Sequence, residues 1–340
     1  MKLKAKDIAK KLSISPSAVS FVLNNKPGVS EETRRKVLKV IEQMGYNTNI
    51  FSKSALSHNR NIRFIIYKKH GLVVSDTPFF SALMEGIDRE ARSLGYNLIV
   101  TYIDENKDNL MKILHIIKAT PPDGIMLLAT EMTKEDLKPF KKLNVPLLLL
   151  DSYFESENLD TVIINNIEGV YKATCYLVEL GHINIGYLHS SVWINNFDQR
   201  MAGFKKAINA KGLKLNENFI FCLESTVDGS HKNMLKILEN KPQLPTALFA
   251  DNDIIAFGAI KAMKEFGIRI PQDVSVIGFD DMPFCEMIDP PLTTVMVYKQ
   301  RMGMIALKRL VERIDEAPAE TIRIEVNTTI VERKSVIKHL

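Results

Sequence analysis

The stretch from Lys4 to Asn25, KAKDIAKKLSISPSAVSFVLNN, limits what this chain can fold into more than any other. Apolar residues recur at helical spacing on both sides of Ser13-Ile14-Ser15, which predicts two short helices joined by a tight turn. Ser15 is placed to cap the second helix. Pro16 follows at the first helical position, where its missing N–H is not needed.

The second helix has two different faces. At about 100° per residue, one face carries the apolar residues Val19, Val22 and Leu23. The opposite face presents Ser17, Phe21 and Asn24. A helix that packs on its neighbour and presents small or polar groups fits the major groove of DNA, which admits a helix about 10–12 Å across. The pattern therefore predicts a helix-turn-helix, and an ordinary helical hairpin is the alternative that it leaves open.

A third helix follows a loop at Asn24–Gly28. Ser30 is placed to cap it, and Glu31 and Glu32 in its first turn suit the helix dipole. An apolar stripe at Val37, Val40, Ile41 and Met44 predicts a buried face. Residues 1–46 thus form a predicted three-helix DNA-binding headpiece. Basic residues of the third helix are either phosphate contacts or a solvated face: Arg34, Arg35, Lys36 and Lys39.

Charge is unevenly distributed along the chain. Residues 1–60 hold 12 Lys/Arg and four Asp/Glu, a net charge of +8, whereas the other 280 of the 340 residues hold 33 and 36, a net charge of −3. This distribution predicts that the basic front, residues 1–60, binds the phosphates of nucleic acid and that the slightly acidic body, the rest of the chain, does not. Residues 47–60 are polar and read as a linker, or as a segment that orders against DNA or a partner chain.

Several function classes lack their sequence signals. Residues 1–30 contain no apolar core of signal-peptide length, and no run approaches a membrane span, so we expect a cytoplasmic protein with no membrane partner. The three cysteines are far apart, which suits a reducing compartment. No HxxH, HExxH, CxxC, GxGxxG, GxxxxGK[ST] or GxSxG motif occurs. We therefore expect no metal, no cofactor and no catalytic residues.

From Ile62 onward the pattern changes to alternating strands and helices. Apolar runs of strand length include Ile62–Tyr67, Asn97–Ile103, Gly124–Leu128, Val145–Leu150, Ile183–Leu188, Phe219–Cys222, Thr246–Ala250 and Val274–Gly278. Helical segments separate them, which predicts an α/β fold with two doubly wound parallel sheets and a cleft between two lobes. A second βα series is expected to start near Thr161.

Polar side chains follow the predicted strands where ligands bind in open α/β sheets. These are Asp151, Asn252 and Asp280, with Trp193, Asn196 and Arg200 in or just after another strand turn and Phe79 at the start of a helix. Carboxylates, amides, an arginine and aromatic faces are the groups that a polyhydroxylated ligand needs. Singly, each could instead cap a helix or belong to the core.

Taken together, the chain resembles the lac repressor/galactose repressor family of bacterial transcription regulators. The matching stretches run in family order over nearly the whole chain and include KDIAKKLSISPSAVSFVLNN, VSEETRRKVLKVIEQMGY, PDGIMLL, NVPLLLLD, QRMAGFKKAI, ADNDIIAFGAIKAMKEFGI, IPQDVSVIGFDDMP and DPPLTTV. The resemblance implies a headpiece, a hinge helix within 47–60, and a core at 61–340 like the periplasmic sugar-binding proteins. Lobe 1 would span about 61–160 and 292–322, and lobe 2 about 161–291 and 323–340.

The resemblance also implies functional residues. DNA contacts would fall on Ser15, Pro16, Ser17, Phe21, Asn24, Ser30, Thr33, Asn49 and Leu56. Effector contacts would fall on Phe79, Asp151, Asn196, Arg200, Asn252 and Asp280, of which Arg200 in QRMAGF and Asn252 in ADND match most securely. The family's dimeric state implies a homodimer on a near-palindromic operator.

The chain departs from the family pattern at three places. Phe21 stands where many members have Arg, which predicts apolar contact with thymine methyls in place of a guanine contact. In the hinge, Thr48 replaces the usual Pro and Ala55 the wedging Leu, with Leu56 one residue later. The loop Lys68–Thr77 is long, and its basic residues either touch an anionic ligand group or are solvated.

The sequence therefore predicts a DNA-binding transcriptional regulator, a repressor controlled by a small carbohydrate-like effector bound between two lobes. One alternative is a cytosolic regulator that responds to a protein corepressor of the carbon-catabolite type. Another is a sugar-binding transport protein, against which the basic front argues.

Overall fold

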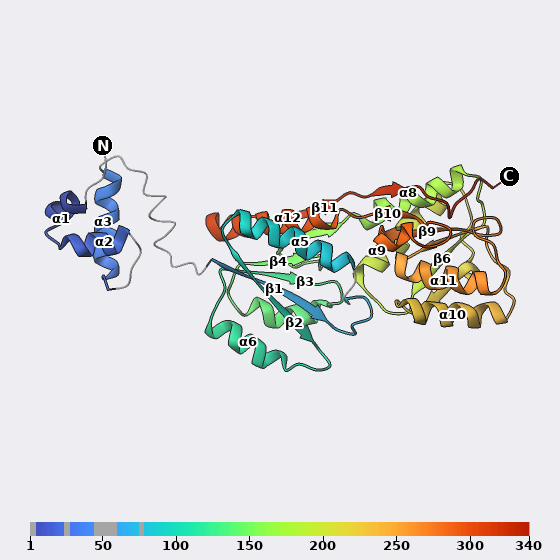
Figure 1. The fold of residues 1–340 in the computed structure, drawn as a ribbon, viewed down its shortest axis with the longest axis horizontal. Helices are drawn as coiled ribbons and strands as arrows, with labels where there is room; N and C mark the ends of the chain where they lie inside the picture. The colour runs from blue at the N-terminus through green and yellow to red at the C-terminus, as the bar shows by residue number, and fades with distance from the viewer. Residues whose placement is uncertain (1–4, 24–27, 44–59, 75–77, 340) are drawn as a thin grey trace. The chain divides into compact units, whose positions relative to one another are not determined.

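The protein is described here from a computed structural model, which covers residues 5–23, 28–43, 60–74 and 78–339 (Figure 1). The chain divides into two units, 1–60 and 61–340. The boundary coincides with the end of the predicted linker, and each unit has a hydrophobic core of its own.

The first unit contains helices α1 (Ala5–Leu12), α2 (Pro16–Leu23) and α3 (Glu31–Gln43). Their inward residues form one small cluster: Ile8, Ala9, Val19, Val22, Val37, Val40 and Ile41. Because these residues recur at three- and four-residue spacing, each helix buries one stripe and leaves the opposite face to solvent. The three-helix prediction is confirmed.

The second unit begins with a six-stranded sheet in the order β11-β5-β4-β3-β1-β2. The strands are β1 (Asn61–Lys68), β2 (Asn97–Asp104), β3 (Gly124–Leu128), β4 (Leu147–Leu150), β5 (Asp160–Ile164) and β11 (Arg323–Val326). All neighbours in it are parallel. Helices α5 (Pro78–Ser93) and α12 (Lys299–Glu316) lie side by side on one face (Figure 1). Helices α6 (Leu110–Ala119) and α7 (Lys134–Lys141) cover the other.

The contact between α5 and α12 depends on glycine. A Cβ on Gly86 would lie 2.0 Å from the carbonyl oxygen of Gln300, and one on Gly303 would lie 2.4 Å from that of Leu83. Neither separation is sterically possible, and the obstacle in both cases is backbone. The two helices therefore approach closely only because both positions lack a side chain.

The second sheet has the order β12-β10-β9-β8-β6-β7, and β12 is antiparallel to β10. Its strands are β6 (Ile185–Ser190), β7 (Ile220–Leu223), β8 (Ala247–Ala250), β9 (Ser275–Asp280), β10 (Thr293–Met296) and β12 (Thr329–Val331). Helices α8 (Asn166–Glu179) and α9 (Asn195–Ala210) pack on one face, and α10 (Val227–Glu239) and α11 (Asp253–Glu265) on the other. Short 3₁₀ turns lie at Glu217–Phe219 and Pro283–Glu286.

Strand pairing places the crossings between lobes differently from the sequence boundaries. Strand β5 belongs to the first sheet, next to β4, so the first crossing follows Ile164, a few residues after the predicted boundary near Thr161. Strand β10 pairs with β9 in the second sheet, so the predicted return to the first lobe at 292 is wrong, and the chain rejoins that lobe only at α12. Strand β11 stays in the first sheet, and the last crossing falls between Val326 and Thr329.

A buried ion pair fixes this arrangement. Asp160, at the start of β5, is 1% exposed and accepts a hydrogen bond from Arg309 Nε of α12 at 2.8 Å. Arg313 of the same helix also pairs with it. The backbone N–H of Ile322, just before β11, donates to the same carboxylate at 2.8 Å. Strands β5 and β11 are thus held with α12 in the first lobe, which explains why two crossings lie a few residues after the predicted boundaries near 161 and 323.

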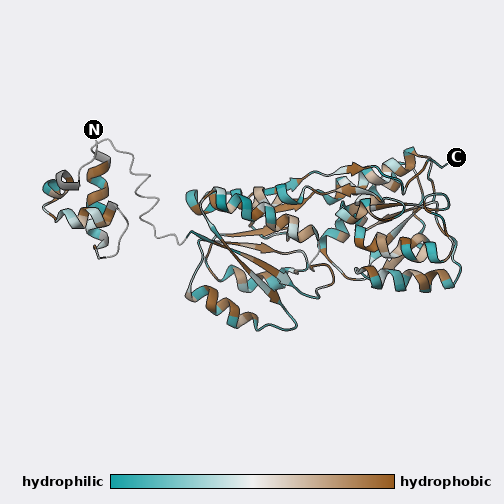
Figure 2. Cartoon of the chain, viewed as in Figure 1, coloured by the Kyte–Doolittle hydropathy of each residue, from teal (hydrophilic) through white to brown (hydrophobic). Residues whose placement is uncertain are grey.

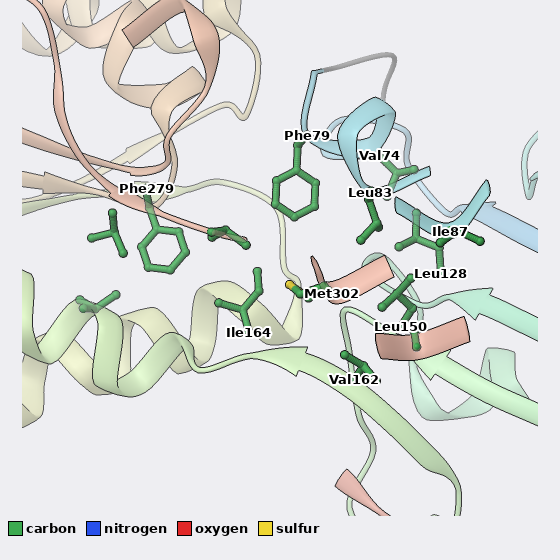
Figure 3. Close-up of a cluster of buried hydrophobic side chains, with 14 of the residues drawn as sticks. Val74, Phe79, Leu83, Ile87, Leu128, Leu150, Val162, Ile164, Phe279 and Met302 are labelled. Carbon is green, nitrogen blue, oxygen red and sulfur yellow. The ribbon is translucent and has the colours of Figure 1, made fainter. Parts of the chain in front are cut away.

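Hydropathy follows the layers. In Figure 2 the strands are largely hydrophobic, whereas the helices carry both hydrophilic and hydrophobic residues. The largest buried cluster includes Phe79, Leu83, Ile164, Phe279 and Met302, drawn from both sheets and their helices (Figure 3). Within the described residues, no helix is both long and apolar enough to cross a membrane.

Candidate functional site

Local hydrogen bonds shape the turn between α1 and α2. The backbone N–H of Ala18 donates to Ser15 Oγ at 3.1 Å, and those of Ala18 and Val19 donate to the Ser15 carbonyl. Pro16 is the first residue of α2. Ser15 therefore caps the helix as expected, and it remains exposed while it does so.

The outward face of α2 carries the predicted recognition residues. Ser17 is exposed, and Phe21 is 39% exposed, an unusual position for a large apolar ring. A Cβ on Gly28, whose φ is +108°, would lie 3.6 Å from the Phe21 ring, so this ring rests beside a glycine and not inside the core. Val19 and Val22 on the opposite face are buried.

Ser30 and Thr33 begin α3 as a pair. Their hydroxyls lie 2.9 Å apart, and the Thr33 N–H donates to Ser30 Oγ at 3.3 Å. Of the basic residues on this helix, Arg34 is 8% exposed, Arg35 and Lys39 are exposed, and Lys36 pairs with Glu32 at 2.7 Å. The predicted contacts Asn24, Asn49 and Leu56, with Thr48 and Ala55, lie outside the described residues.

A cavity of about 210 Å³ lies between the two lobes of the second unit. Six of the seven residues predicted to bind an effector line it: Phe79, Asp151, Asn196, Arg200, Asn252 and Asp280. They come from α5, the end of β4, α9, the start of α11 and the end of β9. The carboxyl ends of strands in both sheets therefore meet here, as expected for open α/β sheets.

Arg200 is the best-held side chain of the cavity. It is 3% exposed, its Nε donates to Asn166 Oδ1 at 2.9 Å, and its Nη1 donates to the carbonyl of Asp251. The guanidinium also stacks on Phe279, 3.8 Å from the ring centroid. Together these contacts fix the plane of the guanidinium in the wall of the cavity.

Two buried carboxylates flank this arginine. Asp151 accepts from Thr130 Oγ1 at 2.7 Å and from Asn196 Nδ2 at 3.0 Å. Burial outweighs these bonds and raises the pKa of Asp151 to about 6. Asp280 lies 3.5 Å from Arg200 Nη2, and burial raises its pKa too, although Arg200 and Lys299 oppose the shift.

Among the described residues that line the cavity, Asp280 has unused hydrogen-bonding capacity, although its Oδ1 is also the atom that lies 3.5 Å from Arg200 Nη2. Its Oδ1 is buried and has no hydrogen-bond partner within the part of the chain that the structure describes. Its backbone has a φ of +114°, a strained conformation for a residue with a Cβ. A buried acceptor that is left open in a cavity is suited to a ligand hydroxyl or N–H group.

Asn252 caps a helix and also lines the cavity. Its Oδ1 accepts from the Ile255 N–H at 2.9 Å and so caps α11. The sequence left capping and ligand binding open as alternatives, and the structure shows the cap on a residue that also lines the cavity.

Trp193 is the predicted residue that the cavity does not include. Its side chain is 50% exposed, and its Nε1 donates to Asp198 Oδ2 at 2.6 Å. Because α9 begins only at Asn195, Trp193 sits in the preceding loop beside Tyr153 and Phe154 in a separate, open hollow.

Sequence reasoning missed part of the cavity wall. Gly71, Leu72, Val73 and Phe80 form an apolar side from the first lobe, and Ser225 and Thr226 add hydroxyls from the second. Ser225 is the second residue after β7, and Asp151 is the first after β4, so the strand-end rule applied to every strand would have found Ser225. The basic loop residues are engaged elsewhere, since Lys69 pairs with Asp136 at 2.6 Å and His70 with Glu131.

Side chains of α9 also connect the lobes directly. Asn196 donates to Asp151, and Asn195 Nδ2 donates to the Tyr153 carbonyl at 3.0 Å. The cavity is therefore bounded by hydrogen bonds that exist only while the lobes are together. The cavity has one apolar wall and one polar wall, so its residues can both bind a ligand and fix its orientation.

Comparison with known proteins agrees with this arrangement. Residues 4–49 match the model described as bacterial regulatory proteins, lacI family, and residues 174–336 match the periplasmic binding protein-like domain. The chain is 32% identical over 338 residues to the HTH-type transcriptional repressor PurR of Pasteurella multocida, covering 98% of this chain and 99% of that protein.

Solved structures show the same fold. The complex of the transcriptional regulator CelR with cellobiose has a TM-score of 0.75 at 23% identity, covering 98% of this chain and all of the other. The lac repressor dimer bound to operator and the anti-inducer ONPF has a TM-score of 0.72 at 22% identity, covering 99% of this chain and all of the other.

A helix-turn-helix unit joined to a two-lobed, periplasmic-binding-protein-like unit defines a ligand-controlled DNA-binding regulator. This chain belongs to the lacI family of bacterial regulatory proteins. It is a DNA-binding transcriptional repressor regulated by a small-molecule effector. The related proteins are transcriptional regulators and not enzymes. The transport-protein alternative gives no account of the matched headpiece.

Proposed function

We propose that this repressor responds to a small, uncharged, carbohydrate-like effector held in the interlobe cavity. The observation that carries the proposal is the arrangement of Arg200 between Asp151 and Asp280, where the Asp280 Oδ1 faces Arg200 Nη2 at 3.5 Å but accepts no hydrogen bond from the described residues. Each hydroxyl of a sugar is both donor and acceptor, and these side chains supply both kinds of partner. The apolar wall of Phe79, Phe80, Leu72 and Val73 suits the C–H face of a sugar ring.

Charge favours a neutral ligand over a phosphorylated one. The cavity is lined by two carboxylates against one guanidinium, and that guanidinium is already hydrogen-bonded to Asn166 and Asp251. An added phosphate would lie among acceptors and would be repelled. Cellobiose in the CelR complex shows that a neutral disaccharide is compatible with this fold.

On the DNA side, we propose a cytoplasmic homodimer that binds two half-sites of a near-palindromic operator. Each headpiece would place α2 in a major groove, with half-sites about 34–36 Å apart. Its contacts would come from Ser15, Pro16, Ser17, Phe21, Ser30 and Thr33, joined by Asn24, Asn49 and Leu56. The exposure of Ser17 and Phe21 supports this choice of face.

The two functions would be coupled through the lobes. An effector that replaces the Asn196–Asp151 bond changes the contacts that hold the lobes together. Because the linker 47–60 leads directly into β1 of the first lobe, a change in the angle between the lobes would be passed to the linker through that strand. Typical couplings of this kind are about 1–3 kcal/mol.

A thermal-shift screen tests the effector class. The panel contains ribose, glucose, cellobiose, glucose 6-phosphate, hypoxanthine and guanine. We expect a neutral sugar to stabilise the protein by about 2.7 kcal/mol at 100 times its dissociation constant, and Arg200→Ala to remove the shift. Stabilisation by glucose 6-phosphate alone, or by a nucleobase alone, would contradict the sugar proposal. Co-purification of a phosphocarrier protein that alters operator affinity would instead support the corepressor alternative.

A further inference from the structure

We propose that Glu131 is a positioning residue for effector binding: it holds the loop Lys69–Val74 in place as the apolar wall of the cavity. The inference rests on the proposed effector function of that cavity. The inference goes beyond that proposed function, because it assigns a role to a carboxylate that does not line the cavity itself.

Five backbone amides of this loop converge on one buried carboxylate. Glu131 Oε2 accepts from the N–H groups of Lys69, His70 and Gly71 at 2.8, 3.0 and 2.9 Å. Glu131 Oε1 accepts from those of Val73 and Val74 at 2.9 and 2.7 Å. The Glu131 side chain is 0% exposed, so these donors replace the water that an ionised carboxylate would otherwise need.

The remaining amide of the loop is also engaged. The Leu72 N–H donates to His70 Nδ1 at 3.2 Å, and that same ring nitrogen lies 3.2 Å from Glu131 Oε1. Every backbone N–H from Lys69 to Val74 thus donates to a side chain. The loop has no ladder of its own, because β1 ends at Lys68, and its conformation depends on these bonds.

The far end of the loop is fixed by packing. Val74 is 1% exposed and belongs to the same buried cluster as Phe79 and Leu83 (Figure 3). Near its start, Lys69 pairs with Asp136 at 2.6 Å, which Thr133 also contacts. Between these two attachments lie Gly71, Leu72 and Val73, the three loop residues that line the cavity.

This geometry has a consequence for recognition. The backbone N–H groups of the loop already donate to Glu131 and His70. The loop therefore presents apolar side chains to a ligand and no free N–H donors. Thr130, the residue before Glu131, lines the cavity and donates to Asp151. The turn that follows β3 therefore has two roles. Its Thr130 makes a polar contact in the cavity, and its Glu131 holds the apolar wall in place.

The test compares Glu131→Gln with the matched control Glu135→Gln. Glu135 is exposed and lies four residues away at the start of α7. A glutamine keeps the shape of Glu131 but turns one acceptor oxygen into a donor group that faces backbone N–H groups. In hydrogen–deuterium exchange of the ligand-free protein, we expect the Lys69–Val74 amides of Glu131→Gln to exchange at least tenfold faster, with α10 and α11 unchanged. Glu135→Gln should match the wild type.

The functional arm uses the neutral sugar from the thermal-shift panel that stabilises the wild type most, measured by isothermal titration. We expect at least tenfold weaker binding for Glu131→Gln and unchanged binding for Glu135→Gln. Unchanged exchange in Glu131→Gln overturns the anchoring claim, and faster exchange with unchanged sugar affinity overturns its role in binding. If no panel compound binds the wild type, the proposed effector fails while the exchange result still decides the anchor.

Discussion

The two units of this protein prepare their functional residues in opposite ways. In the headpiece, the predicted DNA contacts Ser17 and Phe21 are exposed, whereas the residues that hold the three helices together lie on the opposite faces. In the cavity, Asp151, Asn196 and Arg200 are each no more than 3% exposed and are bonded to one another or to their neighbours. Recognition and stability are thus separate at Ser17 and Phe21 of the headpiece and shared in the cavity.

This difference follows from the partners. DNA is a large, charged surface that meets exposed side chains, and its phosphates dominate affinity. A small effector must be surrounded, so its partners are buried, and buried polar groups need bonds of their own before the ligand arrives. Substitutions of Ser17 and Phe21 should therefore affect DNA binding alone, whereas substitutions in the cavity should affect both ligand binding and folding.

The largest expected effect is that of salt on the headpiece. If six to ten phosphates are neutralised, operator affinity should fall about 10³–10⁵-fold between 50 and 200 mM salt. Binding of a neutral sugar in the cavity should change little over the same range. Both can be measured by titration on one preparation. If operator affinity did not change with salt, the electrostatic argument from the basic front would be wrong. If sugar affinity fell as steeply with salt as operator affinity, the two units would not differ in the way described.

Arg200→Ala should come next. It removes a buried cation that faces Asp280 and stacks on Phe279, so we expect the free energy of unfolding to fall by about 3–5 kcal/mol and the effector response to disappear. Urea unfolding and effector titration measure the two effects. Arg301→Ala, on the exposed face of α12, is the control and should change neither. A normal effector response in Arg200→Ala would mean that the effector binds elsewhere.

The third prediction concerns the pH dependence of stability, compared between the wild type and Asp151→Asn. Burial raises the pKa of Asp151 from 3.8 to about 6, so the folded protein keeps the proton that the unfolded chain loses. Wild-type stability relative to Asp151→Asn should therefore fall as pH rises from 4 to 6, by about 2–3 kcal/mol in total. Urea unfolding of both proteins across this range tests it. A difference that stays constant, or that grows with pH in favour of the wild type, would contradict the assignment.

Phe21→Arg should alter recognition without altering the fold. The Phe21 ring is 39% exposed beside Gly28, so we expect the free energy of unfolding to change by less than about 0.5 kcal/mol. Preference at one base pair of each half-site should shift by about 1–3 kcal/mol. Selection of operator variants by the two proteins measures the shift. An unchanged preference, or a large loss of stability, would show that Phe21 is a core residue.

Much of this organisation could be predicted from local pattern. Helical spacing predicted α1 to α3 and the Ser15 cap, and strand-end positions predicted Asp151, Asn252 and Asp280. These signals are local because each depends on the residue's place in one helix or one strand. The structure brings them together because carboxyl ends of parallel strands meet at one edge of each sheet.

Tertiary pairing could not be predicted in the same way. The apolar runs at β5 and β10 look alike whichever sheet they join, and the assignment depends on Asp160 meeting Arg309 across about 150 positions of the chain. Trp193 was placed in the cavity by its distance from a strand, but α9 starts two residues later and Asp198 holds the indole outside. Glu131 gave no signal, since its partners are backbone amides that any sequence carries.

The central claim is that an exposed, basic headpiece binds operator DNA and that the buried cavity adjusts this binding. The most direct measurement is fluorescence anisotropy of a labelled fragment of the protein's own promoter region, titrated with wild type and Arg200→Ala with and without the stabilising sugar. We predict that both proteins bind at low salt and that the sugar changes only the wild-type affinity, by about five- to 150-fold. Failure of the wild type to bind any such fragment at low ionic strength, or an equal sugar effect on Arg200→Ala, would contradict the account.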